Sequence, residues 1–398
     1  MSLSPHRRVP VCVLLSLLTG LSCAHAAAEK PSAPQVLHTS AGTTEVGMID
    51  GTPYRIDVPN GWNHKLIVFY HGYAEQPYAL HIGDPLIDQQ QPFFDRHFAI
   101  AQSAYSQTGW ALEQAFPETE ALRLYFSKAY GAPRETYAVG YSMGGMLVSL
   151  TLEQNPKPYV GGLDFCGSVG PTSEAFEKRF AVRAAFDSYF PGLLPPLLST
   201  PPFMEDSPAQ EEKILAALRS KPAAAAILRN LIGVHSDADA AHDISYYTYV
   251  VGDLQRRAGG NPFDNRNYIY TGGNPDSSAA DYELNDHVQR YAATPQARAY
   301  LTRYYTPTGQ LGRPMLAVHT VYDPVVLVPT IGLYNHMVES AGDAQNLVQQ
   351  YVDRDGHCNF TKEQIGSAFD ELVRWTHNGP RPTPGRLQET AAPPAPAP

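Results

Sequence analysis

Three residues that lie far apart in the sequence, Ser142, Asp323 and His357, are of types that could carry out nucleophilic chemistry together. A serine hydroxyl is a weak nucleophile at neutral pH and needs a base within hydrogen-bond reach. The base in turn needs an acid that fixes its tautomer and stabilises its charged form. Each of the three residues follows closely on a predicted strand. A parallel sheet would therefore bring all three to its carboxyl edge.

Ser142 is the predicted nucleophile because it lies in a Gly-x-Ser-x-Gly motif between a strand signal and a helix signal. The apolar run 137–139 leads into Gly140, and the helical run 146–150 follows Gly144. This is the context of a nucleophile elbow, in which a sharp turn exposes the serine hydroxyl. A Cβ at either glycine would collide with the adjacent strand or helix. The alternative is a tight turn with a purely structural role.

His357 is the predicted general base, and Asp323 is the acid that orients it. His357 follows Gly356 in a loop ahead of a capped helix, and Asp323 follows the apolar run 314–320. Structural alternatives stay open for both residues. They are a solvated histidine and a turn-forming aspartate ahead of Pro324.

Other histidines and aspartates compete for these two roles. His71 and His319 are candidate bases, but His319 lies within a predicted strand, where a packed role suits it better. Asp353 and Asp355 lie too close to His357 in the sequence to supply the usual acid after a late strand, although either could contact it. The sequence therefore favours the pair named above.

An oxyanion that develops during such a reaction needs two backbone N–H groups aimed at it. The Met143 N–H, directly after the nucleophile at the start of a helix, is the first predicted donor. The Tyr73 N–H is the second, because His71 and Gly72 follow the strand 66–70 and Gly72 permits close approach of the backbone. The alternative for this segment is a tight strand end.

The composition predicts a folded globular protein and argues against several classes of partner. Of the 398 residues, 43% are hydrophobic and 17% are charged, which is typical of a folded chain. The net charge is −10 and no basic run follows residue 10, so we expect no nucleic-acid partner and no stable membrane insertion. No His-Glu-x-x-His or Cys-x-x-Cys motif occurs, and the segment 235–243 fits no metal loop. We therefore expect no metal and no cofactor.

The N-terminal residues 1–26 have the features of a signal peptide. A basic start at 6–8 precedes an apolar segment too short to span a bilayer, and the Ala-His-Ala sequence at 24–26 fits the signal-peptidase rule. We therefore expect a secreted or periplasmic protein. The alternatives are a lipoprotein attached through Cys23 and an N-terminal membrane anchor.

The mature chain would contain two cysteines, Cys166 and Cys358. An even pair in an exported protein favours a disulfide bond, because oxidising compartments permit one. Two buried free thiols are the alternative.

The order of the predicted elements favours an α/β fold. Strand signals alternate with helix signals, which is typical of a mostly parallel central sheet flanked by helices. An Asp50-Gly51 turn predicts a hairpin ahead of them. We expect a signal peptide at 1–26, a sheet domain at 27–171 and 312–378, a large and mainly helical cap inserted at 172–311, and a disordered Pro/Ala-rich tail at 379–398.

Four short motifs together resemble those of secreted bacterial α/β-hydrolases of the serine esterase/lipase type. They are Gly140–Gly144, His71-Gly72, 321–324 and Gly356-His357. The order serine, aspartate, histidine along the chain is also that of the family. The resemblance covers residues 44–170 and 312–377 and does not extend to the cap. It implies the α/β-hydrolase fold and the catalytic roles given above.

A second likeness concerns the cysteine beside the histidine. The pair His357-Cys358 is similar to that of the tannase and feruloyl esterase group, in which cysteines adjacent to the serine and the histidine are bridged. Here Tyr141, not cysteine, precedes Ser142, and Cys166 follows the next strand instead. A bond between the two cysteines would then brace the histidine loop.

These resemblances imply an exported serine hydrolase that cleaves a small-molecule or polymeric carboxylic ester through an acyl-enzyme. A serine peptidase or amidase on the same fold is the nearest alternative, and a non-catalytic binding protein on that fold is another. The sequence makes no prediction about the acyl group, the alcohol group or the oligomeric state.

Overall fold

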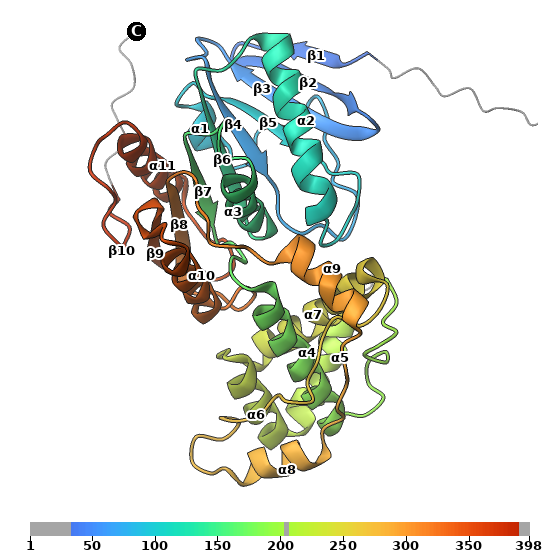
Figure 1. The fold of residues 1–398 in the computed structure, drawn as a ribbon. Coiled ribbons are helices and arrows are strands. Elements are labelled where there is room, and N and C mark those ends of the chain that lie inside the picture. Colours follow the sequence, from blue (N-terminus) through green and yellow to red (C-terminus); the bar gives the residue numbers. More distant parts are fainter. Residues whose placement is uncertain (1–32, 203–206, 390–398) are drawn as a thin grey trace, which may run out of the picture. The chain divides into compact units, whose positions relative to one another are not determined.

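The computed structural model describes residues 33–202 and 207–389 (Figure 1). The predicted signal peptide and its alternatives lie outside these ranges. Within them the chain forms one sheet of ten strands. The strands are β1 Gln35–His38, β2 Gly42–Ile49, β3 Thr52–Pro59, β4 Lys65–Tyr70, β5 Ala99–Ser103, β6 Glu135–Tyr141, β7 Gly161–Phe165, β8 Met315–Tyr322, β9 Leu347–Asp355 and β10 Gly385–Arg386.

Helices separate most of the parallel strands along the chain. Those outside the predicted cap are α1 Gln91–Phe94, α2 Leu112–Tyr130, α3 Met143–Gln154, α10 Val328–Ala341 and α11 Lys362–Thr376, with a 3₁₀ turn, η1, at Ala344–Asn346. Searching the described ranges yields no helix with the combined length and apolarity that a membrane span requires.

The sheet has the order β1-β2-β3-β5-β4-β6-β7-β8-β9-β10. The strands from β5 to β10 run parallel, and β1, β2 and β3 add an antiparallel edge that includes the predicted hairpin at Asp50-Gly51. β6 lies between β4 and β7, near the centre. The expected α/β fold is therefore confirmed.

Both faces of the sheet are covered at its centre, which explains why β4 is apolar from Leu66 to Tyr70 and buried on both sides. Along β4, Leu66 and Val68 face the core beneath α2, α3 and α10, whereas Ile67 and Phe69 face the core beneath α1 and α11. α11 begins with the predicted capping box of Thr361 and Gln364. These layers hold the carboxyl ends of β6, β8 and β9 in fixed positions.

The segment between β7 and β8 is helical, in agreement with the predicted cap (Figure 1). Its apolar side chains belong to the same continuous core as those of α2 and α3, and residues 33–389 fall in one compact unit. The division into a separate cap domain thus stays a prediction. The helices are α4 Thr172–Tyr189, α5 Ser207–Ser220, α6 Pro222–Ile232, α7 Asp237–Ala258, α8 Ala279–His287 and α9 Pro295–Tyr305.

The prediction of a disordered tail was wrong for residues 379–389. β10 pairs in parallel with β9, and the Leu387 N–H donates a hydrogen bond of 2.9 Å to the Tyr351 carbonyl. Leu387 is also buried against the core. A proline-rich segment can run along a sheet edge where few of its N–H groups are needed. Residues 390–398 lie outside the described ranges.

Candidate active site

Ser142 lies at the sharp turn between β6 and α3. Its backbone has φ 57° and ψ −121°, a conformation that L-residues rarely adopt. A Cβ on Gly140 would lie 2.1 Å from the Gly144 carbonyl oxygen, and one on Gly144 would lie 2.2 Å from the Tyr70 carbonyl oxygen. Because α3 begins at Met143, the positive end of its dipole lies beside the serine. The local geometry is that of a nucleophile elbow.

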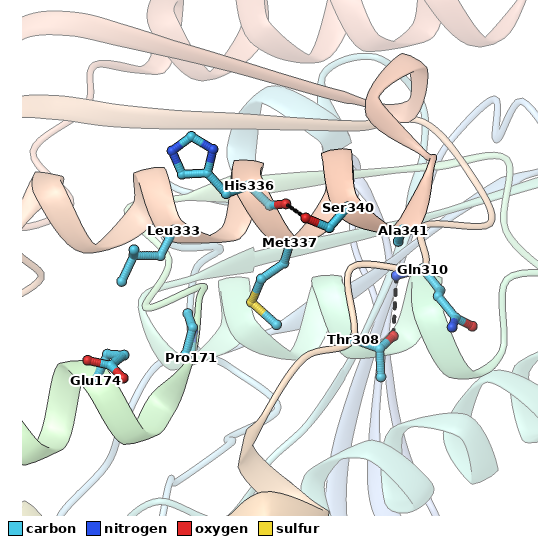
Figure 2. A pocket seen from close by; sticks show the side chains of 9 residues that line it. All are labelled: Pro171, Glu174, Thr308, Gln310, Leu333, His336, Met337, Ser340 and Ala341. Atoms are coloured by element: carbon cyan, nitrogen blue, oxygen red, sulfur yellow. Dashed lines mark hydrogen bonds between the residues drawn. The ribbon is translucent and has the colours of Figure 1, made fainter.

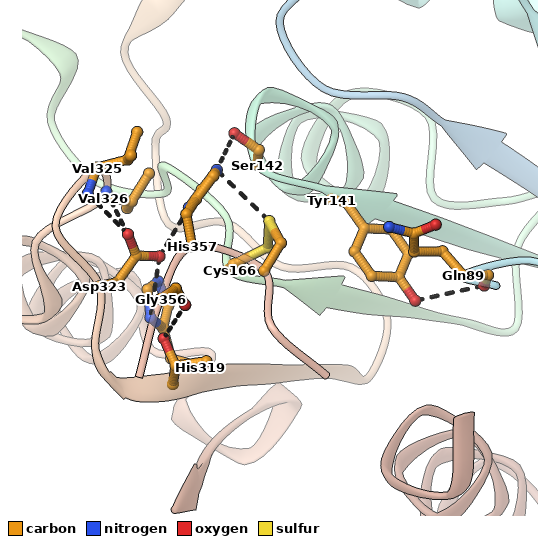
Figure 3. Close-up of a disulfide and its surroundings, with 12 residues drawn as sticks. Gln89, Tyr141, Ser142, Cys166, His319, Asp323, Val325, Val326, Gly356 and His357 are labelled. Atoms are coloured by element: carbon orange, nitrogen blue, oxygen red, sulfur yellow. Dashed lines mark hydrogen bonds and ion pairs between the residues drawn. A yellow bond between two sulfur atoms is a disulfide. The ribbon is translucent and has the colours of Figure 1, made fainter. Parts of the chain in front are cut away.

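The three predicted catalytic residues lie within hydrogen-bond distance of one another (Figure 3). The Ser142 hydroxyl is 2.9 Å from His357 Nε2, and His357 Nδ1 is 2.8 Å from Asp323 Oδ2. A proton on Nδ1 leaves Nε2 free to accept the serine proton. The chain can therefore activate the serine as a nucleophile.

Asp323 directly follows β8 and is 1% exposed. Its second oxygen, Oδ1, accepts hydrogen bonds of 2.9 Å from the N–H groups of Val325 and Val326. Burial alone would raise the pKa of this carboxyl, but the hydrogen bond and the charge of His357 hold it below its ordinary value. Asp323 is therefore an anion that can stabilise a positive imidazole.

The competing groups take other positions. His319 is buried within β8, with Nδ1 4.0 Å from Asp323 Oδ2, and burial lowers its pKa to about 4. Its ring is thus neutral near pH 7 and cannot compensate the Asp323 charge. Asp353 pairs with Arg386 at 3.5 Å. Within the described part of the chain, His357 is the histidine that contacts Ser142.

His71 orients the loop that carries the second predicted oxyanion donor. Its ring is stacked between those of Tyr78 and Tyr105, with centroids 4.3 and 3.9 Å away. Burial lowers its pKa to about 4, so the ring is neutral, and its Nδ1–H donates a hydrogen bond of 2.7 Å to the Gly72 carbonyl. This contact fixes the peptide plane between Gly72 and Tyr73.

The two predicted oxyanion donors flank the serine turn. A Cβ on Gly72 would lie 3.3 Å from the Ser142 Cβ, so this loop passes close to the predicted nucleophile. In residues 33–202 and 207–389, the Tyr73 N–H and the Met143 N–H have no hydrogen-bond acceptor. Unpartnered N–H groups beside a nucleophile are suited to a developing negative charge.

The disulfide bond between Cys166 and Cys358 is present. Cys166 directly follows β7 and Cys358 directly follows His357, so the bond ties the histidine loop to the neighbouring strand. The Cys358 sulfur lies 3.5 Å from His357 Nε2 (Figure 3). Both cysteines have positive φ values, 50° and 54°, which only a well-determined surrounding structure supports.

Tyr141 takes the place that cysteine has in the tannase-type pattern. Its ring stacks on Phe165 with centroids 4.7 Å apart, and its hydroxyl lies 3.4 Å from the Gln89 carbonyl. Phe165 in turn accepts a hydrogen bond of 3.0 Å from the Ser142 N–H. The side chain before the nucleophile is therefore packed into the core, and the bridge starts one strand away.

Asp164 is a neighbour of the elbow that the sequence reasoning missed. It is 1% exposed near the end of β7, and its Oδ1 would lie 1.9 Å from a Cβ on Gly145 and 2.1 Å from one on Gly167. Burial raises its pKa to about 8, against one backbone hydrogen bond from Gly167 that lowers it. A charged residue within the apolar run GGLDF was the signal that could have identified it.

A groove between α10, the start of α4 and the segment 308–310 lies apart from these residues (Figure 2). Leu333 and Met337 line one side, and Pro171 and Glu174 line the other. None of its lining residues belongs to the serine, histidine and aspartate set. The groove therefore contributes no group to the chemistry of the site.

Comparison with other proteins gives only distant similarity. No protein-family profile and no curated protein matches the chain. Tannin acyl hydrolase from Aspergillus niger is similar over 89% of this chain and 83% of its own, with 12% identity and a TM-score of 0.46. Est1E from Butyrivibrio proteoclasticus is similar over 85% of this chain and 99% of its own, with 13% identity and a TM-score of 0.40.

A longer protein shows the same level of similarity. The acylaminoacyl peptidase of Pyrococcus horikoshii has 12% identity and a TM-score of 0.41 over 87% of this chain. This chain spans 41% of the length of that protein.

The chain's own geometry defines its fold. The mostly parallel sheet carries a serine elbow after a central strand, and the aspartate and the histidine follow two later strands. The oxyanion loop follows β4, the strand next to that of the serine. These are the features of the α/β-hydrolase architecture. The chain therefore has the α/β-hydrolase fold, with a long helical segment inserted between β7 and β8.

Proposed function

We propose that the protein is a serine hydrolase that cleaves carboxylic esters through an acyl-enzyme intermediate. The observation that carries the proposal is the continuous set of hydrogen bonds from Ser142 Oγ through His357 to the buried Asp323. Unpartnered N–H groups at Met143 and Tyr73 support it. All the groups that acyl transfer requires come from the chain itself.

In the first half-reaction Ser142 attacks the ester carbonyl while His357 Nε2 accepts the hydroxyl proton. The carbonyl oxygen becomes an oxyanion, which the Met143 and Tyr73 N–H groups stabilise. Asp323 stabilises the imidazolium and keeps its Nδ1 proton in place. The intermediate then collapses, and His357 donates its proton to the leaving alkoxide.

In the second half-reaction a water molecule takes the place of the alcohol. His357 accepts a proton from this water, which attacks the acyl-serine carbonyl. The same two N–H groups stabilise the second oxyanion, and the proton returns to Ser142 as the acid leaves. No metal or organic cofactor takes part in the proposed cycle.

Two supporting expectations belong to the same proposal. The substrate is a small-molecule or polymeric ester, and the protein acts outside the cytoplasm. The Cys166–Cys358 bond supports export, because disulfides persist in oxidising compartments.

The serine is tested with Ser142→Ala and a matched control, Ser149→Ala. Ser149 is buried seven residues further along, in α3, where its hydroxyl donates a hydrogen bond of 2.8 Å to the Met146 carbonyl. Hydrolysis of p-nitrophenyl acetate should fall by roughly 10³-fold or more in Ser142→Ala and stay near the wild-type rate in the control. Labelling by a fluorophosphonate should be lost in the same variant only.

Each other outcome has a defined meaning. Wild-type hydrolysis by Ser142→Ala would refute the nucleophile. Hydrolysis of aminoacyl p-nitroanilides faster than that of the matched esters would favour a peptidase or amidase. An absence of both labelling and hydrolysis in the wild-type protein would favour a non-catalytic binding protein.

A further inference from the structure

The turn that carries the predicted catalytic acid, residues 322–326, is held from the helical insertion. We propose that Arg179 of α4 and Tyr247 of α7 are positioning residues for Asp323, so that the insertion forms part of the catalytic machinery. The proposal rests on the proposed function, because it assigns these residues a role in the same reaction. It differs from a role in substrate contact, because both residues act through the backbone of the turn.

The central contact is at the Val325 carbonyl. This oxygen accepts a hydrogen bond of 2.7 Å from the Tyr247 hydroxyl and one of 3.1 Å from Arg179 Nη2. The N–H of the same residue donates to Asp323 Oδ1 at 2.9 Å. Val325 therefore links the insertion to the carboxylate that orients His357.

The two donors are themselves fixed. Arg179 is 4% exposed, forms an ion pair of 3.0 Å with Asp243 of α7, and lies 4.5 Å from the centroid of the Tyr247 ring. A cation over an aromatic face and beside a buried carboxylate has little rotational freedom. The two donors therefore hold the Val325 carbonyl oxygen in a fixed position.

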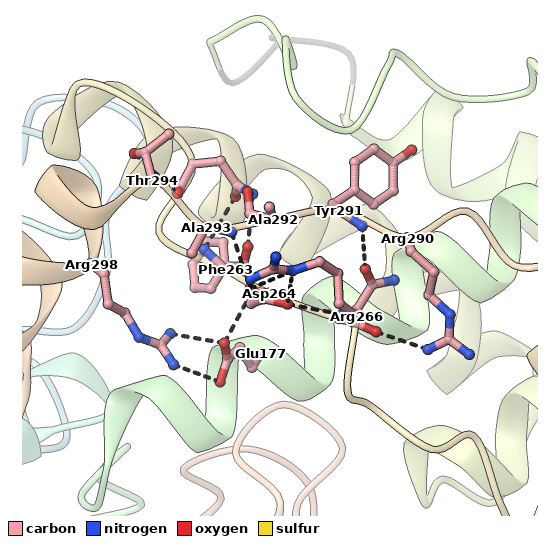
Figure 4. A network of polar contacts seen from close by, with 12 residues as sticks. Glu177, Phe263, Asp264, Arg266, Arg290, Tyr291, Ala292, Ala293, Thr294 and Arg298 are labelled. Atoms are coloured by element: carbon pink, nitrogen blue, oxygen red, sulfur yellow. Dashed lines mark hydrogen bonds and ion pairs between the residues drawn. The ribbon is translucent and has the colours of Figure 1, made fainter.

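The helix that carries Arg179 is anchored two residues earlier (Figure 4). Glu177 of α4 forms an ion pair of 2.8 Å with Arg298 of α9, and it accepts a hydrogen bond of 3.1 Å from the Asp264 N–H. These contacts join three separate segments of the insertion. α4 is thus fixed within the insertion independently of its contact with the acid turn.

Tyr322, the residue before Asp323, is also held by the insertion. The Tyr322 ring stacks on His235 with centroids 3.9 Å apart. Its hydroxyl accepts a hydrogen bond of 3.0 Å from the His235 N–H and donates one of 2.8 Å to Asp239 of α7. Tyr322 before Asp323 and Val325 after it therefore both form hydrogen bonds with the insertion. In each case α7 supplies one of the partners.

Loss of one donor should alter catalysis more than substrate binding. Without the Tyr247 hydroxyl the turn can relax, and the distance between Asp323 and His357 is no longer held at its productive value. Small displacements within a catalytic constellation reduce rates strongly because the transition state demands exact geometry. The expected signature is therefore a change in kcat with little change in KM.

The test compares Tyr247→Phe with Tyr249→Phe. Tyr249 lies on the same helix, is 1% exposed, and donates a hydrogen bond of 3.0 Å to Gln210 inside the insertion. With p-nitrophenyl acetate, kcat should fall roughly 5- to 20-fold in Tyr247→Phe, with KM within about twofold of wild type. Tyr249→Phe should keep both constants within about twofold.

A double-mutant cycle identifies the residue through which Tyr247 acts. In an Asp323→Asn background, Tyr247→Phe should reduce kcat by no more than about twofold, because the carboxylate it positions is already gone. An equal loss in both backgrounds would overturn the proposal. So would a kcat for Tyr247→Phe that equals that of Tyr249→Phe.

The arginine is tested with both partners neutralised, since removing Arg179 alone leaves Asp243 as an uncompensated buried charge. The variant is Arg179→Gln combined with Asp243→Asn. Its control is Arg183→Gln combined with Asp187→Asn, because Arg183 lies one turn further along α4, forms an ion pair with Asp187, and donates to Thr248 and Pro195 within the insertion. Each variant is assayed at the same interval below its own thermal unfolding midpoint, and kcat should then fall in the first variant only. An equal fall in both variants would overturn the role of Arg179.

Failure of this proposal is distinguishable from failure of the proposed function. If Ser142→Ala abolishes hydrolysis while the Arg179 and Tyr247 variants behave as their controls, the positioning role alone is refuted. If Ser142→Ala hydrolyses p-nitrophenyl acetate at the wild-type rate, the proposed function is refuted as well.

Discussion

Ser142 and His357 meet at 2.9 Å, yet different kinds of contact hold the two sides of the site. The serine side is fixed by the backbone, where β6, α3 and the glycines at 140 and 144 leave room for one conformation. The histidine side is fixed by side chains, which include the Cys166–Cys358 bond and the contacts of the insertion with the acid turn. We expect the serine side, which a local backbone turn fixes, to tolerate almost no substitution. The histidine side is fixed by several separate contacts, so we expect it to lose function in steps as these are removed.

Among variants that keep Ser142, Asp323 and His357, the largest expected effect on catalysis is that of Gly144→Ala, which fills the space at the serine turn. The added Cβ would lie 2.2 Å from a backbone carbonyl that cannot move aside. We expect the free energy of unfolding to fall by about 3 kcal/mol and ester hydrolysis to fall roughly 100-fold or more. Chemical denaturation and p-nitrophenyl acetate assays measure both.

Gly332→Ala is the matched control, because a Cβ there meets nothing within 4 Å on α10. Alanine in a helix interior should raise stability by about 1 kcal/mol at most. Wild-type stability and activity in Gly144→Ala would show that the serine turn is not as tightly packed as the comparison requires.

An intermediate effect on catalysis is expected when the histidine side loses its disulfide bond through Cys166→Ala combined with Cys358→Ala. The bond joins positions 192 residues apart, so its loss should lower the free energy of unfolding by about 5 kcal/mol. We expect kcat to fall roughly tenfold, because the histidine loop is still held by the Asp323 contact.

Dithiothreitol supplies the control for the same prediction. It should reduce the activity of the wild-type protein and leave that of the double variant unchanged. Two thiols that react with iodoacetamide in the unreduced, denatured wild-type protein would contradict the presence of the bond.

The smallest effect on catalysis is expected for Asp164→Asn, which removes a buried titratable group beneath the elbow without changing its shape. The folded carboxyl has a pKa of about 8 and the unfolded one has its ordinary pKa of 3.8, so the folded state binds the extra proton between these pH values. Stability of the wild-type protein therefore falls as the pH rises from about 4 to about 8.

The asparagine variant should lack this dependence. Its free energy of unfolding should exceed that of wild type by a few kcal/mol at pH 8, and the difference should shrink at pH 5, while kcat stays within about twofold. Thermal unfolding at the two pH values measures the change. A difference that grows toward low pH would mean that Asp164 is buried as an anion.

The comparison also explains which parts of the site could be predicted from the sequence. The elbow was predictable because a turn between a strand and a helix needs glycines at fixed positions beside the serine. Asp323 and His357 were predictable because each follows a strand signal, and parallel strands end at the same edge. The apolar runs of β4, β6 and β8 likewise predicted their burial.

The contacts of the acid turn were not predictable in this way. Arg179 and Tyr247 reach Val325 across 146 and 78 residues of sequence, and no local pattern marks a side chain for a distant carbonyl. Aromatic residues such as Tyr246, Tyr247 and Tyr249 are dense in the insertion, but their types alone do not identify the groups they contact. Asp164 was missed because the space around its carboxylate depends on Gly145 of α3 as well as on the nearby Gly167.

The C-terminal strand β10 affects how the molecule behaves among other molecules. β10 pairs with Gln350 and Tyr351 of β9, the strand that leads to His357, and so covers backbone groups that would otherwise be exposed at the outer edge. An unpaired edge strand is a template for a strand of another chain and thus for aggregation. The new edge is flanked by Pro380, Pro382 and Pro384, which have no N–H to offer. The prolines that suggested disorder therefore make this edge of the sheet less able to pair with a strand of another chain.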